Sequence, residues 1–326
     1  MTARGIRAFL GMSHTPLLGL AKIDPAIEAR LRSAIEQARH HVLRWAPDRI
    51  VLIGPDHYNG FFNELMPTFC IGSSATSVGD YLMPTGSLNV DAHTALACAE
   101  FLTDMRFDPA VSRRMRVDHG FTQPLQLIWG SLDTPPVLPI FVNSVAPPSI
   151  PRVARCLELG RALGAFVEQL PGRTLLLGSG GLSHEPPVPR MDDSDPAVRE
   201  RITTRSELTE EIRQRKIKLV IAAGRALAAG DPAMKPLNEA WDARWMEAIE
   251  HADFAYFKTL TEDAITRDAG LSGHESKTWL IGRAALPAGV SGCEFRHYQA
   301  IDELIAGYGL MFVDGSSPQH PQLPHE

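Results

Sequence analysis

The sequence predicts an α/β fold in which helices cover both faces of a central, largely parallel sheet, with additional helices in the C-terminal third. Two observations lead to this prediction. Short aliphatic and β-branched runs recur through the first half of the chain, and amphipathic helical stretches separate them. Because strands that alternate with helices usually pair in parallel beneath helical layers, we expect these strands to be buried on both faces.

Four apolar runs, each followed by a turn-like segment, are the expected strands. They cover residues 6–10, 49–53, 137–142 and 174–177. The clearest helix covers residues 25–45, where Asp24 and Pro25 supply an N-cap and a first helical residue. Asp195 and Pro196 repeat this signal before another helix. After about residue 197 the pattern becomes mainly helical, with helices expected at residues 208–228, 237–251 and 274–285.

The 326 residues are enough for one large domain or two modest ones. No internal repeat is convincing, so residues 1–313 are predicted to form a single domain. The final segment, residues 314–326, is polar and rich in proline, and we expect it to be a disordered tail.

Composition argues against several classes of protein. The formal charge is −6 and the basic residues form no stripe, so nucleic acid is not an expected partner. The four cysteines contain no CxxC pair, which argues against a disulfide framework or a thiolate zinc site and favours a reducing cytoplasm. No run approaches about 18 uninterrupted apolar residues, so no membrane span is expected.

Four of the twelve histidines occupy positions that suggest chemistry. His14, His57 and His184 each follow a predicted strand, and His119 precedes a predicted helix. Ligands of open α/β sheets bind outside the carboxyl ends of the strands, so the three histidines that follow strands should converge there. The alternative for any single histidine is a hydrogen-bonded structural role.

Two histidines with one carboxylate would suit ferrous iron that must bind both a substrate and oxygen. A catalytic zinc site can use the same types of ligand. The carboxylate candidate is Glu275, which lies near a predicted helix start, and Glu185 and Asp56 compete with it. A glutamate at a helix start also stabilises the helix dipole without any further role.

Four motifs in order give the chain a family resemblance. PDHYNGFF around His57, VDHGFTQPL around His119, GSGGLSHEPPVP around His184 and GHESKTW around Glu275 together resemble the type III extradiol dioxygenases. The likeness runs from about Ile6 to Gly309. The chain departs from the family pattern in a few extra N-terminal residues, in the composition of residues 192–218 and in the tail, and none of these departures touches a motif.

The resemblance implies a compact α/β homo-oligomer that uses iron(II) and dioxygen to cleave a catechol beside its two hydroxyls. It makes His14, His57 and Glu275 the iron ligands, His184 the proton acceptor and His119 the proton donor. The resemblance also implies 2,3-dihydroxyphenylpropionate and its cinnamate analogue as substrates, in the breakdown of aromatic compounds. The implied product is a 2-hydroxy-6-oxo-nonadienedioate.

Recognition of the substrate side chain is less clear from the sequence. Tyr58, Asn59 and Phe61, together with Phe62, follow His57 and could wall an aromatic pocket, although the Phe pair could equally lie in the core or in a subunit contact. No single basic residue stands out as the partner of a substrate carboxylate. Three other functions stay open: cleavage of another catechol such as gallate or protocatechuate, zinc-dependent hydrolysis at the same ligands, and binding without catalysis.

Overall fold

The computed structural model describes residues 4–205 and 208–316. Its centre is an eight-stranded sheet whose four middle strands run parallel. In spatial order the strands are β10 (Phe295–Ile301), β11 (Ala306–Asp314), β1 (Ile6–Met12), β9 (Arg173–Ser179), β2 (Arg49–Gly54), β8 (Val137–Val142), β3 (Phe69–Gly72) and β6 (Ala110–Ser112). A small second sheet contains β5 (Gly86–Ser87), β4 (Ala75–Ser77) and β7 (Met115–Val117).

The four strands expected from the sequence are the four parallel strands at the centre, which confirms the fold class. The edges of the sheet are mixed. On one side β11 is antiparallel to β1 and carries β10, and on the other side β3 is antiparallel to β8 and carries β6 in parallel. Strands β10 and β11 were not predicted, because the region after residue 197 reads as mainly helical.

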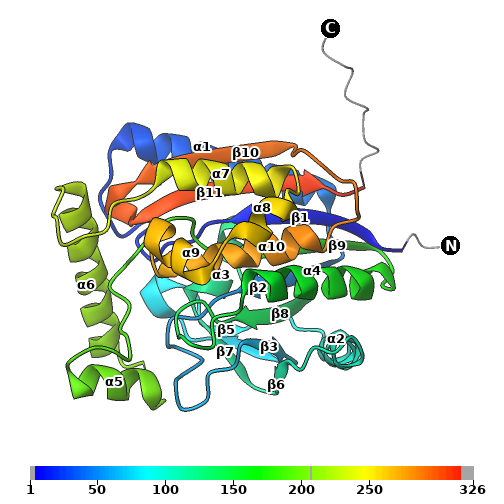
Figure 1. The fold of residues 1–326 in the computed structure, drawn as a ribbon, viewed down its shortest axis with the longest axis horizontal. Helices are drawn as coiled ribbons and strands as arrows, with labels where there is room; N and C mark the ends of the chain where they lie inside the picture. The colour runs from blue at the N-terminus through cyan, green and yellow to red at the C-terminus, as the bar shows by residue number, and fades with distance from the viewer. Residues whose placement is uncertain (1–3, 206–207, 317–326) are drawn as a thin grey trace, which may run out of the picture.

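Helices lie along both faces of this sheet (Figure 1). The helices are α1 (Pro25–Trp45), α2 (Ala92–Asp104), α3 (His119–Trp129), α4 (Val153–Glu168), α5 (Pro196–Thr203), α6 (Glu210–Ala228), α7 (Glu239–Glu250), α8 (Phe254–Thr259), α9 (Glu262–Ala269) and α10 (Lys277–Ala284). Three 3-10 helices, η1 (Asp80–Leu82), η2 (Ser272–Ser276) and η3 (Asp302–Leu304), complete the elements. None of the described helices is long and apolar enough to cross a membrane.

The caps expected from the sequence form. The Asp24 side chain accepts hydrogen bonds from the backbone N–H groups of Ala26 and Ile27, and α1 begins at Pro25. Asp195 caps α5 in the same way by accepting from Ala197. These carboxylates satisfy N–H groups that the first turn leaves without partners, so both helices begin where the sequence predicts.

Side chains of each central strand alternate between two buried layers. In β1, Ala8 and Leu10 pack in the layer that contains α1 and α3, whereas Phe9 packs in the layer that contains α4 and α10. Because both layers are apolar, the central strands carry hydrophobic residues at almost every position. Strand β11 continues to Asp314, the first residue of the expected tail, and residues 317–326 lie outside the described residues.

Helix α6 stands across one end of the molecule, the end at which β1 finishes (Figure 1). The carboxyl ends of the parallel strands therefore lie under a helical cover. The first half of α6 falls within residues 192–218, the region in which a departure from the family pattern is expected from the sequence.

A close approach of α10 to β9 fixes the segment that precedes α10. A Cβ atom added at Gly178 would lie 2.7 Å from the carbonyl oxygen of Thr278 and 2.9 Å from the Cα atom of Trp279. The Thr278 hydroxyl donates to the carbonyl of Ser179 at 2.8 Å. Only glycine allows these backbones to lie so close, and η2 is held at the end of β9 as a result.

We predict that Gly178→Ala weakens the fold and displaces η2. The added methyl group has no space and would push α10 from the sheet, lowering the free energy of unfolding by about 1–3 kcal/mol. Urea denaturation followed by circular dichroism measures this change. A variant with an unchanged urea midpoint would contradict the proposed close contact.

Candidate active site

Three histidines come together at the ends of three neighbouring strands. His14 follows β1, His57 follows β2 and His184 follows β9, and β9 lies between the other two in the sheet. Their Nε2 atoms lie 3.3, 3.1 and 3.3 Å from a carboxylate oxygen of Glu275. The structure therefore brings all three onto one carboxylate, as the position of the histidines after the strands suggested.

Glu275 lies in η2 and is completely buried. Its Oε2 atom also accepts a hydrogen bond from the backbone N–H of Gly181 at 3.2 Å. Burial alone would raise the pKa of this carboxyl, but the nearby imidazoles of His184 and His14 hold the pKa well below its usual range. The site therefore holds a permanent negative charge at its centre.

His14 presents an unprotonated Nε2 atom to this centre. The Ser179 hydroxyl donates its only proton to the carbonyl of Gly120 at 2.5 Å, so its oxygen accepts from His14 Nδ1, 2.9 Å away. Burial lowers the pKa of His14 to about 3, although Glu275 opposes this shift. A neutral imidazole with Nδ1 protonated is the form that binds a metal ion through Nε2.

His57 is oriented by a carboxylate. Its Nδ1 atom lies 3.0 Å from Asp118 Oδ2, which also accepts from the side-chain amide of Asn59 at 2.9 Å. Burial would lower the pKa of His57, but Asp118 and Glu275 outweigh it and raise the pKa well above its ordinary value. Asp118 thereby fixes the Nδ1 proton and leaves Nε2 facing Glu275.

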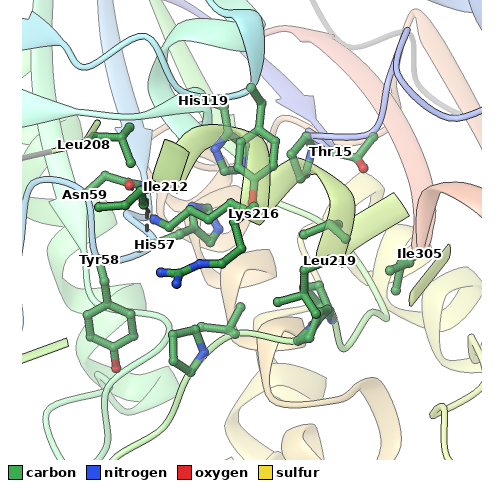
Figure 2. A pocket seen from close by; sticks show the side chains of 18 of the residues that line it. Thr15, His57, Tyr58, Asn59, His119, Leu208, Ile212, Lys216, Leu219 and Ile305 are labelled. Carbon is green, nitrogen blue, oxygen red and sulfur yellow. Dashed lines mark hydrogen bonds between the residues drawn. The ribbon is translucent and has the colours of Figure 1, made fainter. Parts of the chain in front are cut away.

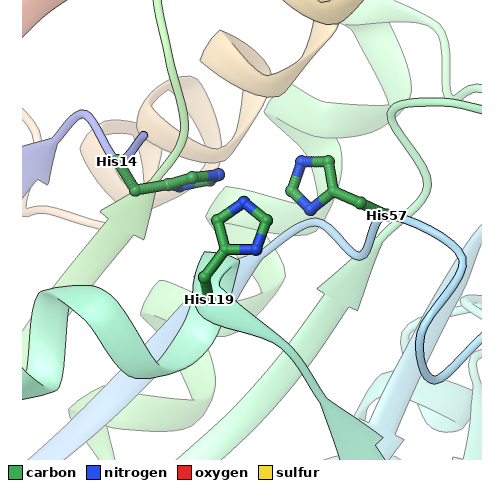
Figure 3. Close-up of side chains that lie close together, drawn as sticks. All are labelled: His14, His57 and His119. Atoms are coloured by element: carbon green, nitrogen blue, oxygen red, sulfur yellow. The ribbon is translucent and has the colours of Figure 1, made fainter. Parts of the chain in front are cut away.

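His119, the first residue of α3, lies against the other two rings (Figure 3). It stacks on His57 with ring centroids 4.5 Å apart and meets His14 edge-on at 5.3 Å. The Asp80 carboxylate makes two contacts with His119. Its Oδ2 atom lies 2.6 Å from His119 Nδ1, and its Oδ1 atom accepts a hydrogen bond from the backbone N–H of His119 at 2.9 Å. Because a carboxylate accepts hydrogen bonds, Asp80 fixes a proton on Nδ1 and leaves Nε2 as the other ring nitrogen.

His184 has a different second partner. Its Nδ1 atom lies 3.0 Å from the carbonyl oxygen of Leu182. Since a carbonyl only accepts, Nδ1 carries the proton, and the neutral ring presents the lone pair of Nε2 to the site. Burial lowers the pKa of His184, but Glu275 outweighs this effect and raises it.

The two competing carboxylates face elsewhere. Asp56 accepts hydrogen bonds from the backbone N–H groups of residues 59–61 in its own loop. Glu185 accepts from Leu271 at 3.2 Å and lies 3.8 Å from the ammonium group of Lys235. Of the three candidates named from the sequence, Glu275 is the one that contacts the histidines.

Three overlapping donor sets among the described residues could hold a metal ion. The first is His14, His57 and Glu275. The second is His14, His57 and His119, and the third is Asp80, Asp118 and His119; in each of these two sets the possible ligand atoms lie within 4.8 Å of one another. The first set fits a cation well, because a completely buried carboxylate faces two imidazole nitrogens and has no lysine or arginine partner among the described residues. Nitrogen and oxygen donors of this kind suit iron or zinc.

A cavity of about 350 Å³ opens beside these histidines (Figure 2). Tyr58 and Asn59, named from the sequence, line it together with His14, His57, His119 and His184. Phe61 does not line it, because its ring stacks on Phe141 with centroids 3.8 Å apart. Phe62, named from the sequence beside Phe61, does line it.

Sequence reasoning missed the residues that orient the histidines. Asp118 directly precedes His119 in VDHGF, so its position offered a signal, but its main contact is with His57. The sequence carried no signal for Asp80 or Ser179, because both lie far along the chain from the histidines that they contact. Asp80 contacts His119, and Ser179 contacts His14. Asp80 lies beside Tyr81 and Leu82, whose positive φ angles of 44° and 62° mark a strained turn at the site.

Known proteins are similar in sequence to this chain over nearly its whole length. Residues 8–312 match the family described as the catalytic LigB subunit of aromatic ring-opening dioxygenase. A 2,3-dihydroxyphenylpropionate/2,3-dihydroxicinnamic acid 1,2-dioxygenase of Comamonas testosteroni is 59% identical over 96% of this chain and 97% of its own. An enzyme of the same name from Burkholderia vietnamiensis is 45% identical over 92% of this chain and 95% of its own. Another, from a Rhodococcus species, is 42% identical over 93% of this chain and 96% of its own.

We predict that Glu275→Gln lowers the affinity for a divalent metal by roughly 100-fold or more, because the change removes the only charged donor while keeping its shape. Anaerobic equilibrium dialysis against Fe²⁺ followed by metal analysis measures this loss. Glu185→Gln is the matched control and should bind metal as the wild type does. Full metal occupancy of the Glu275 variant would instead favour a donor set that contains His119.

Proposed function

Because the chain belongs to the LigB family of aromatic ring-opening dioxygenases, we propose that it cleaves 2,3-dihydroxyphenylpropionate at an iron(II) held by His14, His57 and Glu275. The reaction would incorporate both atoms of dioxygen beside the diol and yield a 2-hydroxy-6-oxo-nonadienedioate. 2,3-Dihydroxycinnamate, which the relatives' name also contains, is a second proposed substrate.

The observation that carries this proposal is the buried carboxylate of Glu275. It has 0% exposure and contacts three imidazoles but no fixed cation among the described residues. Burying a carboxylate whose partners are titratable imidazoles and not fixed cations is costly, and a divalent ion would offset that cost. Two histidines and one carboxylate on one side of the ion leave room for both reactants, which favours iron over a closed structural site.

When bound, iron(II) supplies a Lewis acid that lowers the pKa of the catechol hydroxyls and a position for dioxygen. The chain supplies the proton transfers. His184 is proposed to accept a catechol proton at Nε2, which is the acceptor in its neutral form because the carbonyl of Leu182 holds the proton of Nδ1.

His119 is proposed to act in the opposite sense. Breaking the O–O bond requires a proton for the departing oxygen, and an imidazolium can donate it. The Asp80 carboxylate occupies the Nδ1 side of the ring, so Nε2 is the atom from which His119 would give the proton. The proposed roles differ because the second partner of His184 is the carbonyl of Leu182 and that of His119 is the carboxylate of Asp80.

The cavity agrees with an aromatic substrate. Its wall is largely apolar and includes the aromatic residues Tyr58, Phe62 and Tyr81, and the centroid of the Tyr81 ring lies 5.1 Å from that of His119. A flat ring buried against such side chains gains from both burial and ring packing. The homo-oligomer and the cytoplasmic location expected from the sequence stay predictions.

We predict that His119→Gln and His184→Gln each lower kcat for ring cleavage by roughly 10²–10⁴-fold while iron content stays near wild type. Glutamine keeps hydrogen bonding but cannot carry the proton. Stopped-flow absorbance of the yellow ring-opened product, with iron measured on the same samples, checks both statements. His40→Gln, at an exposed position on α1, is the control. A variant that loses its iron would make that histidine a ligand.

We also predict that activity decays in air and returns with ferrous iron and ascorbate, because oxidation of the ferrous ion removes the reactive state. Oxygen uptake should be faster with 2,3-dihydroxyphenylpropionate than with protocatechuate or gallate. Turnover that needs no dioxygen and follows zinc content would favour a hydrolase instead. Faster uptake with protocatechuate would assign the enzyme to another catechol.

A further inference from the structure

The side of the cavity formed by α5 and α6 carries positive charge. Arg201 comes from α5, and Arg215 and Lys216 come from α6. We call these three residues the cationic wall. Among the residues that the structure describes, no aspartate or glutamate lines the same cavity.

The face that α6 turns toward the cavity is set by its helical period. Ile212, Arg215, Lys216, Leu219 and Val220 line the cavity and recur at the spacing of one helix face. Lys218 lies between them in sequence but is exposed and does not line the cavity. The helical period therefore places Arg215 and Lys216 beside the cavity and Lys218 toward solvent.

Lys216 connects this wall to the histidines. Its ammonium group donates to the side-chain oxygen of Asn59 at 2.8 Å, drawn as a dashed line in Figure 2. Asn59 in turn donates to Asp118, the partner of His57. Lys216 and His57 also line the same cavity, so a ring held at His57 would share that cavity with the cationic wall.

Positive charges gathered in an apolar cavity repel one another unless an anion joins them. Lys216 is the least exposed of the three residues, since Arg201 and Arg215 are exposed. Burial lowers the pKa of Lys216, and the positive charge of Arg201 lowers it further, although nearby aspartates oppose both effects. An anion placed at Lys216 would meet less competition from water than one at the exposed arginines and would accept a charge-assisted hydrogen bond from the ammonium group.

We infer that the cationic wall binds the side-chain carboxylate of the substrate, with Lys216 as its main contact, and so selects catechols that carry an acid group. This inference rests on the proposed function, and it names the residues that set substrate class. The diol would lie at the histidines, the side chain would cross the apolar part of the cavity, and the carboxylate would end at Lys216 with the two arginines beside it.

The test compares two substrates that differ in charge, 2,3-dihydroxyphenylpropionate and 3-propylcatechol. Lys216→Met should lower kcat/KM for the acid by about 10- to 100-fold, mainly through KM, because a charge-assisted hydrogen bond is lost. The value for 3-propylcatechol should change by less than about 3-fold, since that substrate never used the charge. Arg201→Gln and Arg215→Gln should each reduce the preference for the acid by a smaller factor.

Two further variants separate a binding role from a structural one. Lys216→Arg keeps the charge and should retain most of the preference, whereas Lys218→Met, on the same helix, should leave both substrates unaffected. Calorimetric titration of 3-phenylpropionate, which has the carboxylate but no diol, should show binding to the wild type and loss of binding to Lys216→Met.

The outcomes distinguish this inference from the proposed function. Equal losses of kcat/KM for both substrates in Lys216→Met would overturn the inference and make Lys216 a support for Asn59. An unchanged preference in all three single variants would overturn it as well. If the wild type opens neither catechol, the proposed function fails first, and the titration with 3-phenylpropionate still reports on the cationic wall.

Discussion

A single buried carboxylate organises the functional end of this molecule. Glu275 can contact His14, His57 and His184 only because β1, β9 and β2 lie side by side and finish at the same edge of the sheet. It also needs η2 to lie directly against the end of β9. A Cβ atom at Gly180 would come within 2.5 Å of the Glu275 carbonyl oxygen, so glycine there is a condition of the contact.

Identical imidazole rings acquire different properties from their second partners. A hydroxyl oxygen or a carbonyl oxygen fixes the tautomer of a ring without adding charge, whereas a carboxylate also stabilises the protonated ring. The Nδ1 atom of each ring has a different partner: Ser179 for His14, Leu182 for His184, Asp118 for His57 and Asp80 for His119. Four histidines within one small volume can therefore differ in their affinity for protons and for a metal, which is the requirement for separate ligand, base and acid roles.

The sequence predicted those parts of the fold that depend on local chemistry. The central strands read as apolar runs because both of their faces are buried, and α1 begins at Pro25 because Asp24 caps it. The edge strand β10 was missed because its residues are only partly buried and show no clear alternation. Asp80 could not have been found, because its contact with His119 spans 39 positions and has no local pattern.

The residues that line the cavity could likewise be predicted only in part, because their side-chain directions depend on the fold. Phe61 and Phe62 are adjacent, and choosing which ring enters the cavity requires the backbone direction after Tyr58, whose φ angle of 56° is unusual for a residue with a side chain. The basic residues on α6 were present in the sequence, but their position in the cavity wall depends on where the helix lies relative to the strand ends.

The strand order has a consequence for how the protein is made. His57 and Glu275 are 218 positions apart, and the hydrogen bond that orients His14 spans 165. Contacts of such long range close late in folding because the loop entropy must be lost before they form. While the ribosome is still producing the first two thirds of the chain, His14 and His57 exist without Glu275. The cluster of three histidines around this carboxylate is thus completed only when the segment that contains η2 has been added.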